Sequence, residues 1–416
     1  MGFRISLVRI VAAAAAAAGI ALGALVPSGA AAAGATTSAG EGTVTISGKA
    51  FRFGKRYPVL VNALIKVREY PELWTLSDEK GDYELEVPDD ANVTPYIVSG
   101  WNGNYKDPRT DPLDPLTQHY NSIDLQTFHT RGEDIVNANF QTPTDAEYNS
   151  LKALLKVPSS ADNRPEQCVI VTTSSARNVR GVDYDAYWDN TPHGVAGATA
   201  YTLPDMLRPM YFNDAVLPDP NQQSSSGDGG IIWAIVPTGT YRVITEHPDT
   251  RFASFLATCA PGRVVNANPP WGAYELAPGE QPLAASNVAA KVTAAKAARK
   301  GRRARNVTVS IEAGERVDAT ATLTKGGKTI GRKTVGLDAG DRTIRFAVKP
   351  GVKPGKATVE VGLADAAGVS FASTHTVKLP KVLKKKAKKK AKGKKKAKKA
   401  KAKKAKAKAK AKRASR

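Results

Sequence analysis

The feature that most constrains this chain is a repeat, because three short stretches recur in the same order within residues 43–280. Each stretch combines turn-forming residues with alternating side chains, a pattern typical of a strand with one buried face. Residues 61–65 match 195–199, residues 81–88 match 230–237, and residues 131–140 match 261–269. Three matches in one order indicate that the front of the chain holds two copies of a single β-module.

The spacing of the matches locates insertions and a linker. The difference in residue number between matched stretches is 134 at the first match, 149 at the second and 129 at the third. The rise indicates extra residues in the second copy, within 201–229. The fall indicates extra residues in the first copy, within 101–123. Insertions of this kind lie on surface loops, which often carry binding residues. Between the copies, Thr144 followed by Glu147 is a capping-box pattern and predicts a helix over 144–156.

Both copies resemble carboxypeptidase regulatory-like domains, a family of small prealbumin-type β-sandwiches. The resemblance rests on residues 58–67, on the Gly-Asp-Tyr turn at 81–83, and on the Pro-x-Gly-x-Tyr strand at 236–243. The first copy lacks the Gly of that strand, and the second lacks the Tyr after its turn. The resemblance implies prealbumin-like sandwiches at 43–143 and 166–280 with a helical linker at 144–165. It implies spacer or adhesive modules of a secreted protein and no particular activity.

A third β-unit is predicted at 306–380. Residues 281–305 are rich in Ala, Lys and Arg and are interpreted as a basic linker. Beyond them, short alternating stretches separated by Gly-Gly and Pro-Gly turns predict a small Ig-like sandwich. The expected fold class is therefore all-β: tandem β-sandwiches, two prealbumin-like and one Ig-like, followed by a disordered basic C-terminal tail.

The tail, residues 381–416, holds 22 Lys and Arg and no acidic residue. No apolar residue larger than Ala follows Leu383, so the tail cannot bury a core and is expected to be disordered in isolation. Its charge density predicts binding to polyanions, and the alternative is a merely solubilising appendage. The lysines singled out for polyanion binding are Lys384, Lys385, Lys386, Lys388, Lys389, Lys390, Lys394, Lys395 and Lys396.

The beginning of the chain has the pattern of a secretory signal. Arg4 and Arg9 precede an uncharged apolar run at 10–26, and a Pro-Ser-Gly break with small residues follows, so residues 1–35 are predicted as a signal peptide. An uncleaved membrane anchor is the alternative, and no later segment could span a bilayer. Export favours a disulfide between Cys168 and Cys259. A secreted or cell-surface protein, monomeric in its mature form, is expected.

Motifs that carry chemistry are missing from the sequence. The five histidines have no metal-ligand spacing, and neither a Gly-x-Ser-x-Gly elbow nor a phosphate-binding loop occurs. The acids at 183–190 only faintly resemble a calcium loop. We therefore predict no catalytic residue, no metal and no cofactor.

Aromatic residues beside Asn and Asp could instead stack on sugar rings, with packing under a long loop as the alternative. These candidates are Trp101, Tyr105, Tyr184, Tyr187 and Trp188. Two function classes follow. The first is an exported, non-catalytic envelope or surface protein whose tail binds anionic cell-envelope polymers or acidic polysaccharide, with extracellular nucleic acid as a further alternative. The second is a secreted carbohydrate-binding module protein.

Overall fold

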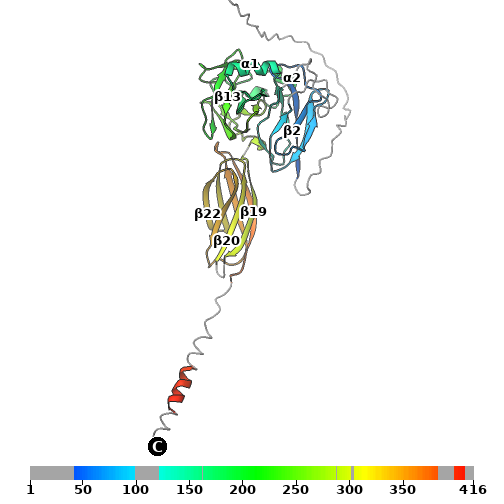
Figure 1. The fold of residues 1–416 in the computed structure, drawn as a ribbon. Helices are drawn as coiled ribbons and strands as arrows, with labels where there is room; N and C mark the ends of the chain where they lie inside the picture. The colour runs from blue at the N-terminus through cyan, green and yellow to red at the C-terminus, as the bar shows by residue number, and fades with distance from the viewer. Residues whose placement is uncertain are drawn as a thin grey trace, which may run out of the picture. The chain divides into compact units, whose positions relative to one another are not determined.

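The computed structural model describes residues 42–98, 121–161, 163–286, 288–300, 304–382 and 398–407. Most of the regular structure in these ranges is strand, apart from helix α1 (Asp145–Leu155) within 121–161 and the last range, which is helical (Figure 1). None of the described helices is long and apolar enough to cross a membrane. The chain is mostly β, as predicted, with 49% strand and 10% helix, and the strands form several separate sheets.

The first copy is built on strand β1, which lies between an antiparallel and a parallel neighbour. Strand β4 alternates along its length, so that Tyr83, Leu85 and Val87 are buried while Glu84 and Glu86 are exposed. A second sheet has β2 at its centre, and a short pair, β5 and β7, lies beside it. The strands are β1 (Thr43–Arg52), β2 (Leu64–Val67), β3 (Trp74–Leu76), β4 (Asp82–Pro88), β5 (Asn92–Val93), β6 (Pro95–Ile97), β7 (Phe128–His129) and β8 (Phe140–Thr142).

The second copy repeats this pairing. Its first strand, β9, is antiparallel to β13 and parallel to β17, as β1 is to β4 and β8. The insertion at 201–229 forms the added hairpin of β11 and β12. The strands are β9 (Cys168–Ser175), β10 (Thr199–Leu203), β11 (Met210–Phe212), β12 (Pro218–Asp219), β13 (Gly230–Val236), β14 (Gly239–Glu246), β15 (Arg251–Phe252), β16 (Phe255–Cys259), β17 (Val264–Ala267) and β18 (Ala273–Leu276).

Two of the three matched stretches have corresponding strand partners in the two copies, in agreement with the predicted duplication. Residues 81–88 and 230–237 contain β4 and β13, the antiparallel neighbours of the first strands. Residues 131–140 run parallel to β1 through the bridge between Ile46 and Ile135. Residues 261–269 contain β17, which runs parallel to β9.

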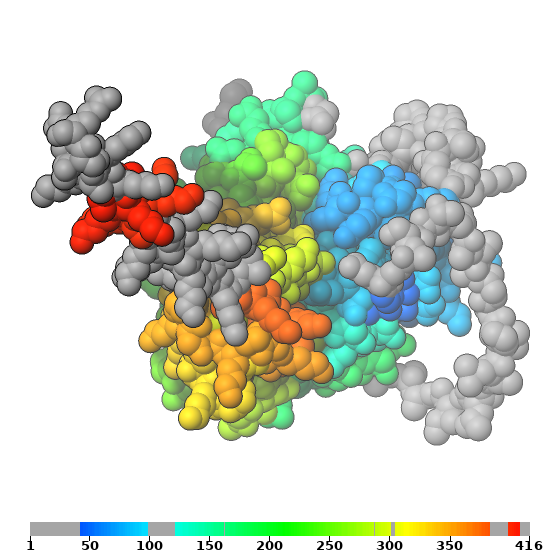
Figure 2. All heavy atoms as spheres, turned by 90° about the horizontal axis from the view of Figure 1, so that it is seen from below, coloured from blue at the N-terminus to red at the C-terminus, as the bar shows by residue number. Residues whose placement is uncertain are grey.

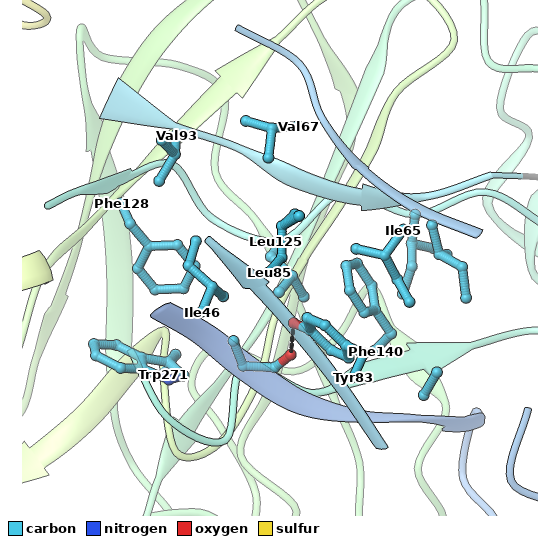
Figure 3. Close-up of a cluster of buried hydrophobic side chains, with 14 of the residues drawn as sticks. Ile46, Ile65, Val67, Tyr83, Leu85, Val93, Leu125, Phe128, Phe140 and Trp271 are labelled. Carbon is cyan, nitrogen blue, oxygen red and sulfur yellow. Dashed lines mark hydrogen bonds between the residues drawn. The ribbon is translucent and has the colours of Figure 1, made fainter. Parts of the chain in front are cut away.

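One hydrophobic cluster spans the two copies, and the second copy has a further cluster of its own. The shared cluster contains most of the buried side chains of the first copy together with Val169, Phe212, Ile232, Val264 and Trp271 of the second. Figure 3 shows Trp271 beside Phe128, and their rings meet edge to face at 5.0 Å. Backbone hydrogen bonds also join the copies, since Asp124 N donates to the Val264 carbonyl and Thr127 N to the Leu256 carbonyl, both at 2.8 Å. Sequence reasoning treated the copies as separate modules and did not foresee this union.

Helix α1 (Asp145–Leu155) connects the two copies and confirms the predicted capping box. Thr144 Oγ1 accepts from Glu147 N at 3.2 Å, and Glu147 Oε2 accepts from Thr144 N at 3.0 Å. The apolar side of α1, with Tyr148, Leu151 and Leu155, lines a cavity of about 70 Å³ over the second copy. The cavity wall is almost wholly apolar, so this space is a packing void beneath the helix.

The third unit has its own core between two sheets of long strands (Figure 1). One sheet has the order β19-β20-β23 and the other β22-β21-β24-β25. Alternation is clear on β20, where Val307, Val309 and Ile311 are buried between partly exposed neighbours. The strands are β19 (Ala290–Lys300), β20 (Ala304–Ala313), β21 (Val317–Lys325), β22 (Lys328–Leu337), β23 (Gly340–Val348), β24 (Gly355–Ala364) and β25 (Ser370–Leu379).

The predicted basic linker at 281–305 needs correction. From Ala290 onward it is strand β19, which pairs with β20 as far as Lys300. Ala, Lys and Arg have low strand propensity, so the local composition hides the strand. Pairing with β20 and partial burial of Val292, Ala295 and Ala297 against the core override that propensity.

Candidate functional site

The predicted disulfide is present in the second copy. Cys168 begins β9 and Cys259 ends β16, and their Cα atoms lie 5.5 Å apart. Both residues are buried in the core cluster of this copy. The bond therefore ties the start of β9 to the end of β16, and its burial indicates a structural role.

Two of the candidate sugar-stacking aromatics pack inward. Tyr184 and Trp188 lie on the short helix α2 (Tyr184–Asp189) and both meet the ring of Phe51 edge to face, at 4.9 and 5.9 Å. The Tyr184 hydroxyl donates to the Arg56 carbonyl. These contacts fix α2, which belongs to the second copy, against the first copy.

Tyr187 is packed in a different way. Its ring stacks on His193 with centroids 4.6 Å apart and planes 11° from parallel. Burial raises the pKa of Tyr187 to about 12. The described aromatics therefore form packing contacts of the front of the chain, while Trp101 and Tyr105 lie outside the described residues. The sequence could not show this, because Phe51 and Arg56 are more than 120 residues away.

The acids that faintly resembled a calcium loop have structural partners. Asp183 is the N-cap of α2 and accepts from Ala186 N at 2.8 Å. Asp185 and Asp189 both pair with Arg56, at 2.5 and 3.3 Å. Among the described residues, no group of three His, Cys, Asp or Glu side chains is placed to hold a metal ion. The pattern at 183–190 is thus accounted for by a capped helix and its docking.

An open cleft of about 780 Å³ lies over strands β10 and β14, and sequence reasoning did not find it. Tyr201 lines it with 37% of its surface exposed, and its hydroxyl lies 3.4 Å from Glu246 Oε1. His247 Nδ1 accepts from Asp249 N at 3.2 Å, which leaves Nε2 to carry the proton of the neutral ring. Arg251 and Phe252 complete a wall of flat rings and charged groups. Such a wall can stack on and hydrogen-bond a polar ring ligand.

The predicted polyanion-binding lysines, Lys384 to Lys396, lie outside the described residues. The described part of the tail, residues 398–407, is a helix of lysines and alanines whose side chains are all exposed. Its six lysines are Lys398, Lys399, Lys401, Lys403, Lys404 and Lys406. Within this described part of the tail, no lysine forms an ion pair, so these charges are available to an external anion.

Comparisons with known proteins give only structural matches of low score. No family model matches the chain, and no curated protein does. A tetra-tandem repeat from the extending region of a large adhesion protein is 9% identical, with a TM-score of 0.18 over 81% of this chain and 74% of that one. The FN1–FN3 domains of chicken CNTN1 are also 9% identical, with a TM-score of 0.18 over 78% of this chain and 92% of that one.

The BSP domain of a biofilm-associated protein gives a similar result. It is 10% identical, with a TM-score of 0.15 over 85% of this chain and 68% of that chain. Scores this low show no shared fold in detail and supply no ligand or activity. The residues of this chain must therefore carry the functional argument.

Proposed function

We propose that this chain is an exported, non-catalytic protein of the cell envelope or surface, in which the β-sandwiches are structural and adhesive units and the tail binds anionic polymers. The observation that carries the proposal is the tail, with its 22 cationic side chains, no acid, and fully exposed lysines wherever it is described. Multivalent cations of this density bind polyanions by releasing counterions.

Three further observations agree with this proposal. A buried disulfide suits an oxidising compartment outside the cytoplasm. The matched strand pairing of the two front copies agrees with tandem prealbumin-like modules. The acidic side chains at 183–190 serve helix capping and packing, which suits a structural module. Anionic wall polymers are the favoured partners because an exported protein meets them first.

The test compares the mature full chain with a chain ending at Val382 on isolated cell envelopes. We expect the full chain to be retained and to be released steeply as NaCl rises, because counterion release makes binding salt-dependent. Changing the tail lysines to arginine should preserve retention, and changing them to glutamine should abolish it. Equal, salt-resistant retention of the shortened chain would show that the tail is only a solubilising appendage.

Carbohydrate binding is the second candidate function, and the Tyr201 cleft favours it. The proposal is that a neutral sugar stacks on Tyr201 while Glu246 and Arg251 bind its hydroxyls. A glycan array with the chain ending at Val382 tests this without the tail. Tyr201→Ala should remove any glycan signal, whereas Tyr57→Ala, at a tyrosine 65% exposed elsewhere, should leave it unchanged. An array without signal rejects this second function.

A further inference from the structure

One end of the third unit collects lysines. The turns between β21 and β22 and between β23 and β24, the end of β19 and the exit of β25 all lie at this end, since Lys300 pairs with Ala304, Lys325 with Lys328, and Gly355 with Leu379. Figure 2 views the unit, coloured yellow to orange, from this side. We call this end the basic pole and define it by Lys300, Lys325, Lys328, Lys349, Lys353 and Lys381.

Acidic residues of the third unit are kept away from the basic pole. Six of the seven acids between 287 and 380 lie at or beside the opposite ends of the strands, and the seventh, Glu360, lies in the middle of β24. The six are Glu312, Glu315, Asp318, Asp338, Asp341 and Asp365. The turns of the pole therefore carry cations and no carboxylate, so this end of the third unit has a net positive charge.

A buried arginine, Arg305, lies beneath the basic pole at the start of β20. Arg305 is only 1% exposed, because it occupies an inward position at the start of β20 in line with Val307 and Val309. Its guanidinium donates to the carbonyls of Val352 at 2.5 Å and of Lys349 and Pro380 at 3.4 Å. Among the described residues no carboxylate pairs with Arg305, and its Nε has no hydrogen-bond partner.

Arg305 has two consequences for the pole. It holds the β23–β24 turn and the exit of β25 in fixed positions, so the lysines on them are presented by a rigid frame. The charge of Arg305 also has no carboxylate partner among the described residues. Because the protein around the buried guanidinium screens its charge less than water does, Arg305 attracts an anion at the pole more strongly than an exposed arginine would. The carbonyl of Pro380 accepts from Arg305, so the polycationic tail leaves the unit from the pole itself.

We propose that the basic pole is a folded binding surface for a linear phosphate polymer, continuous with the tail. This inference rests on the proposed function, and it adds that polyanion binding does not reside in the tail alone. A phosphate polymer is favoured over a carboxylated polysaccharide because counterion release grows with the linear charge density of the ligand. The pole and the tail bind the same polymer molecule. Once one of them is bound, binding of the other is intramolecular and increases the overall affinity.

The experiment measures binding of long-chain inorganic polyphosphate over a range of NaCl concentrations. It uses the mature full chain, the chain ending at Val382, and two triple variants of the shortened chain. The pole variant is Lys328→Gln, Lys349→Gln and Lys353→Gln, all at exposed turn positions. The matched control is Arg316→Gln, Arg332→Gln and Lys333→Gln, which removes three exposed cations of β22 and the opposite end. Thermal unfolding of both variants checks that the fold is intact.

We expect the chain ending at Val382 to bind polyphosphate measurably, and the pole variant to bind about 10- to 100-fold more weakly at low salt with a salt slope smaller by about 2. The control should change little. If the full chain binds but the shortened chain does not, or if both variants lose affinity equally, the pole has no special role and the tail alone carries binding. If the full chain binds none of polyphosphate, polygalacturonate and double-stranded DNA, the proposed function fails as well. Tighter binding of polygalacturonate or of double-stranded DNA, at equal charge, overturns the choice of ligand.

Discussion

The front two copies and the third unit are joined to their neighbours by different forces. The front copies share a hydrophobic cluster and backbone hydrogen bonds, and residues 36–286 have 19 basic and 31 acidic residues, a net charge of −12. The third unit has a closed core of its own, and residues 287–380 have 18 basic and 7 acidic residues, a net charge of +11. We expect the cluster that spans the two front copies to make them unfold together, whereas a unit with a separate core can unfold by itself.

The contact between the second copy and the third unit is ionic. Arg242, only 2% exposed, pairs with Glu315 through Nε at 2.9 Å and with Asp365 through Nη1 at 3.4 Å. Glu315 also accepts from Ala289 N at 2.8 Å. Buried ion pairs contribute little net stability, but they are costly to break on one side. The front pair and this junction should therefore respond differently to reductant, to truncation of side chains and to pH.

Loss of the disulfide should have the largest effect and should spare the third unit. Cys168 and Cys259 are 91 residues apart, so the bond should stabilise the front pair by about 4–5 kcal/mol in the chain-entropy model. Calorimetry of the double variant Cys168→Ser, Cys259→Ser should show a lowered front transition and an unchanged third-unit transition. A common shift of both would show that all three units unfold together.

Truncation of the shared cluster comes next. Trp271→Ala should destabilise the front pair by about 3–5 kcal/mol, because it empties a site against Phe128 and removes a hydrogen bond from Nε1 to the Val136 carbonyl. Since Trp271 belongs to the second copy and Phe128 to the first, both copies should lose stability together. Hydrogen exchange measures each copy separately, and loss of protection in the second copy alone contradicts the shared cluster.

Breaking the ionic junction should cost somewhat less. Glu315→Gln leaves Arg242 buried without its closest carboxylate, and we expect a loss of about 3 kcal/mol, at the low end for a buried pair. The loss should appear as earlier unfolding of the third unit, with the front transition in place. The triple variant Arg242→Met, Glu315→Met, Asp365→Asn leaves no unpaired buried charge and should recover most of the loss. If it recovers none, these residues stabilise the junction by packing and not only by charge compensation.

The smallest expected effects are on the pH dependence of stability, which should differ between the front copies and the third unit. Burial, opposed by the hydrogen bond to Asp90, lowers the pKa of His129 in the first copy below 6.5. The stability that neutral His129 contributes is thus complete above pH 6.5 and is lost as pH falls through the folded pKa. Unfolding of the front pair at pH 7 and 5 should show this loss, and His129→Gln should abolish it.

Asp365 at the junction should show the opposite sign. Burial raises the pKa of this carboxyl above 3.8, although Arg242 opposes the rise. Its ionisation therefore destabilises the folded third unit as pH rises from 3.8 through the raised pKa. Asp365→Asn should stabilise the third unit at pH 7 and have no effect at pH 3. Equal effects at both values would show that packing, rather than charge, decides this position.

Features that depend on neighbours in sequence could be predicted, and those that depend on distant partners could not. The capping box at Thr144 and the turn-bounded strands have local causes, and the sequence shows them. Docking of Tyr184 on Phe51 and the strand character of 290–300 arise from tertiary contacts and leave little local trace. One signal was present, since Val169, Ile170 and Val171 are consecutive apolar residues, which indicates a strand covered on both faces. That pattern pointed to the shared cluster.

In each copy the first strand pairs in parallel with a strand near the end of the copy, and this pairing has a mechanical consequence. In the first copy β1 runs parallel to β8, and in the second β9 runs parallel to β17, so tension on the ends of a copy pulls the paired strands in opposite directions along their length. The hydrogen bonds between them are then loaded in shear, all at once, instead of being unzipped one by one. The disulfide also withholds 91 residues from extension, about 300 Å of contour. Stretching single molecules with and without reductant should show this enclosed length as extra extension when the disulfide is reduced. Reduction under load would then lengthen the chain without breaking its backbone.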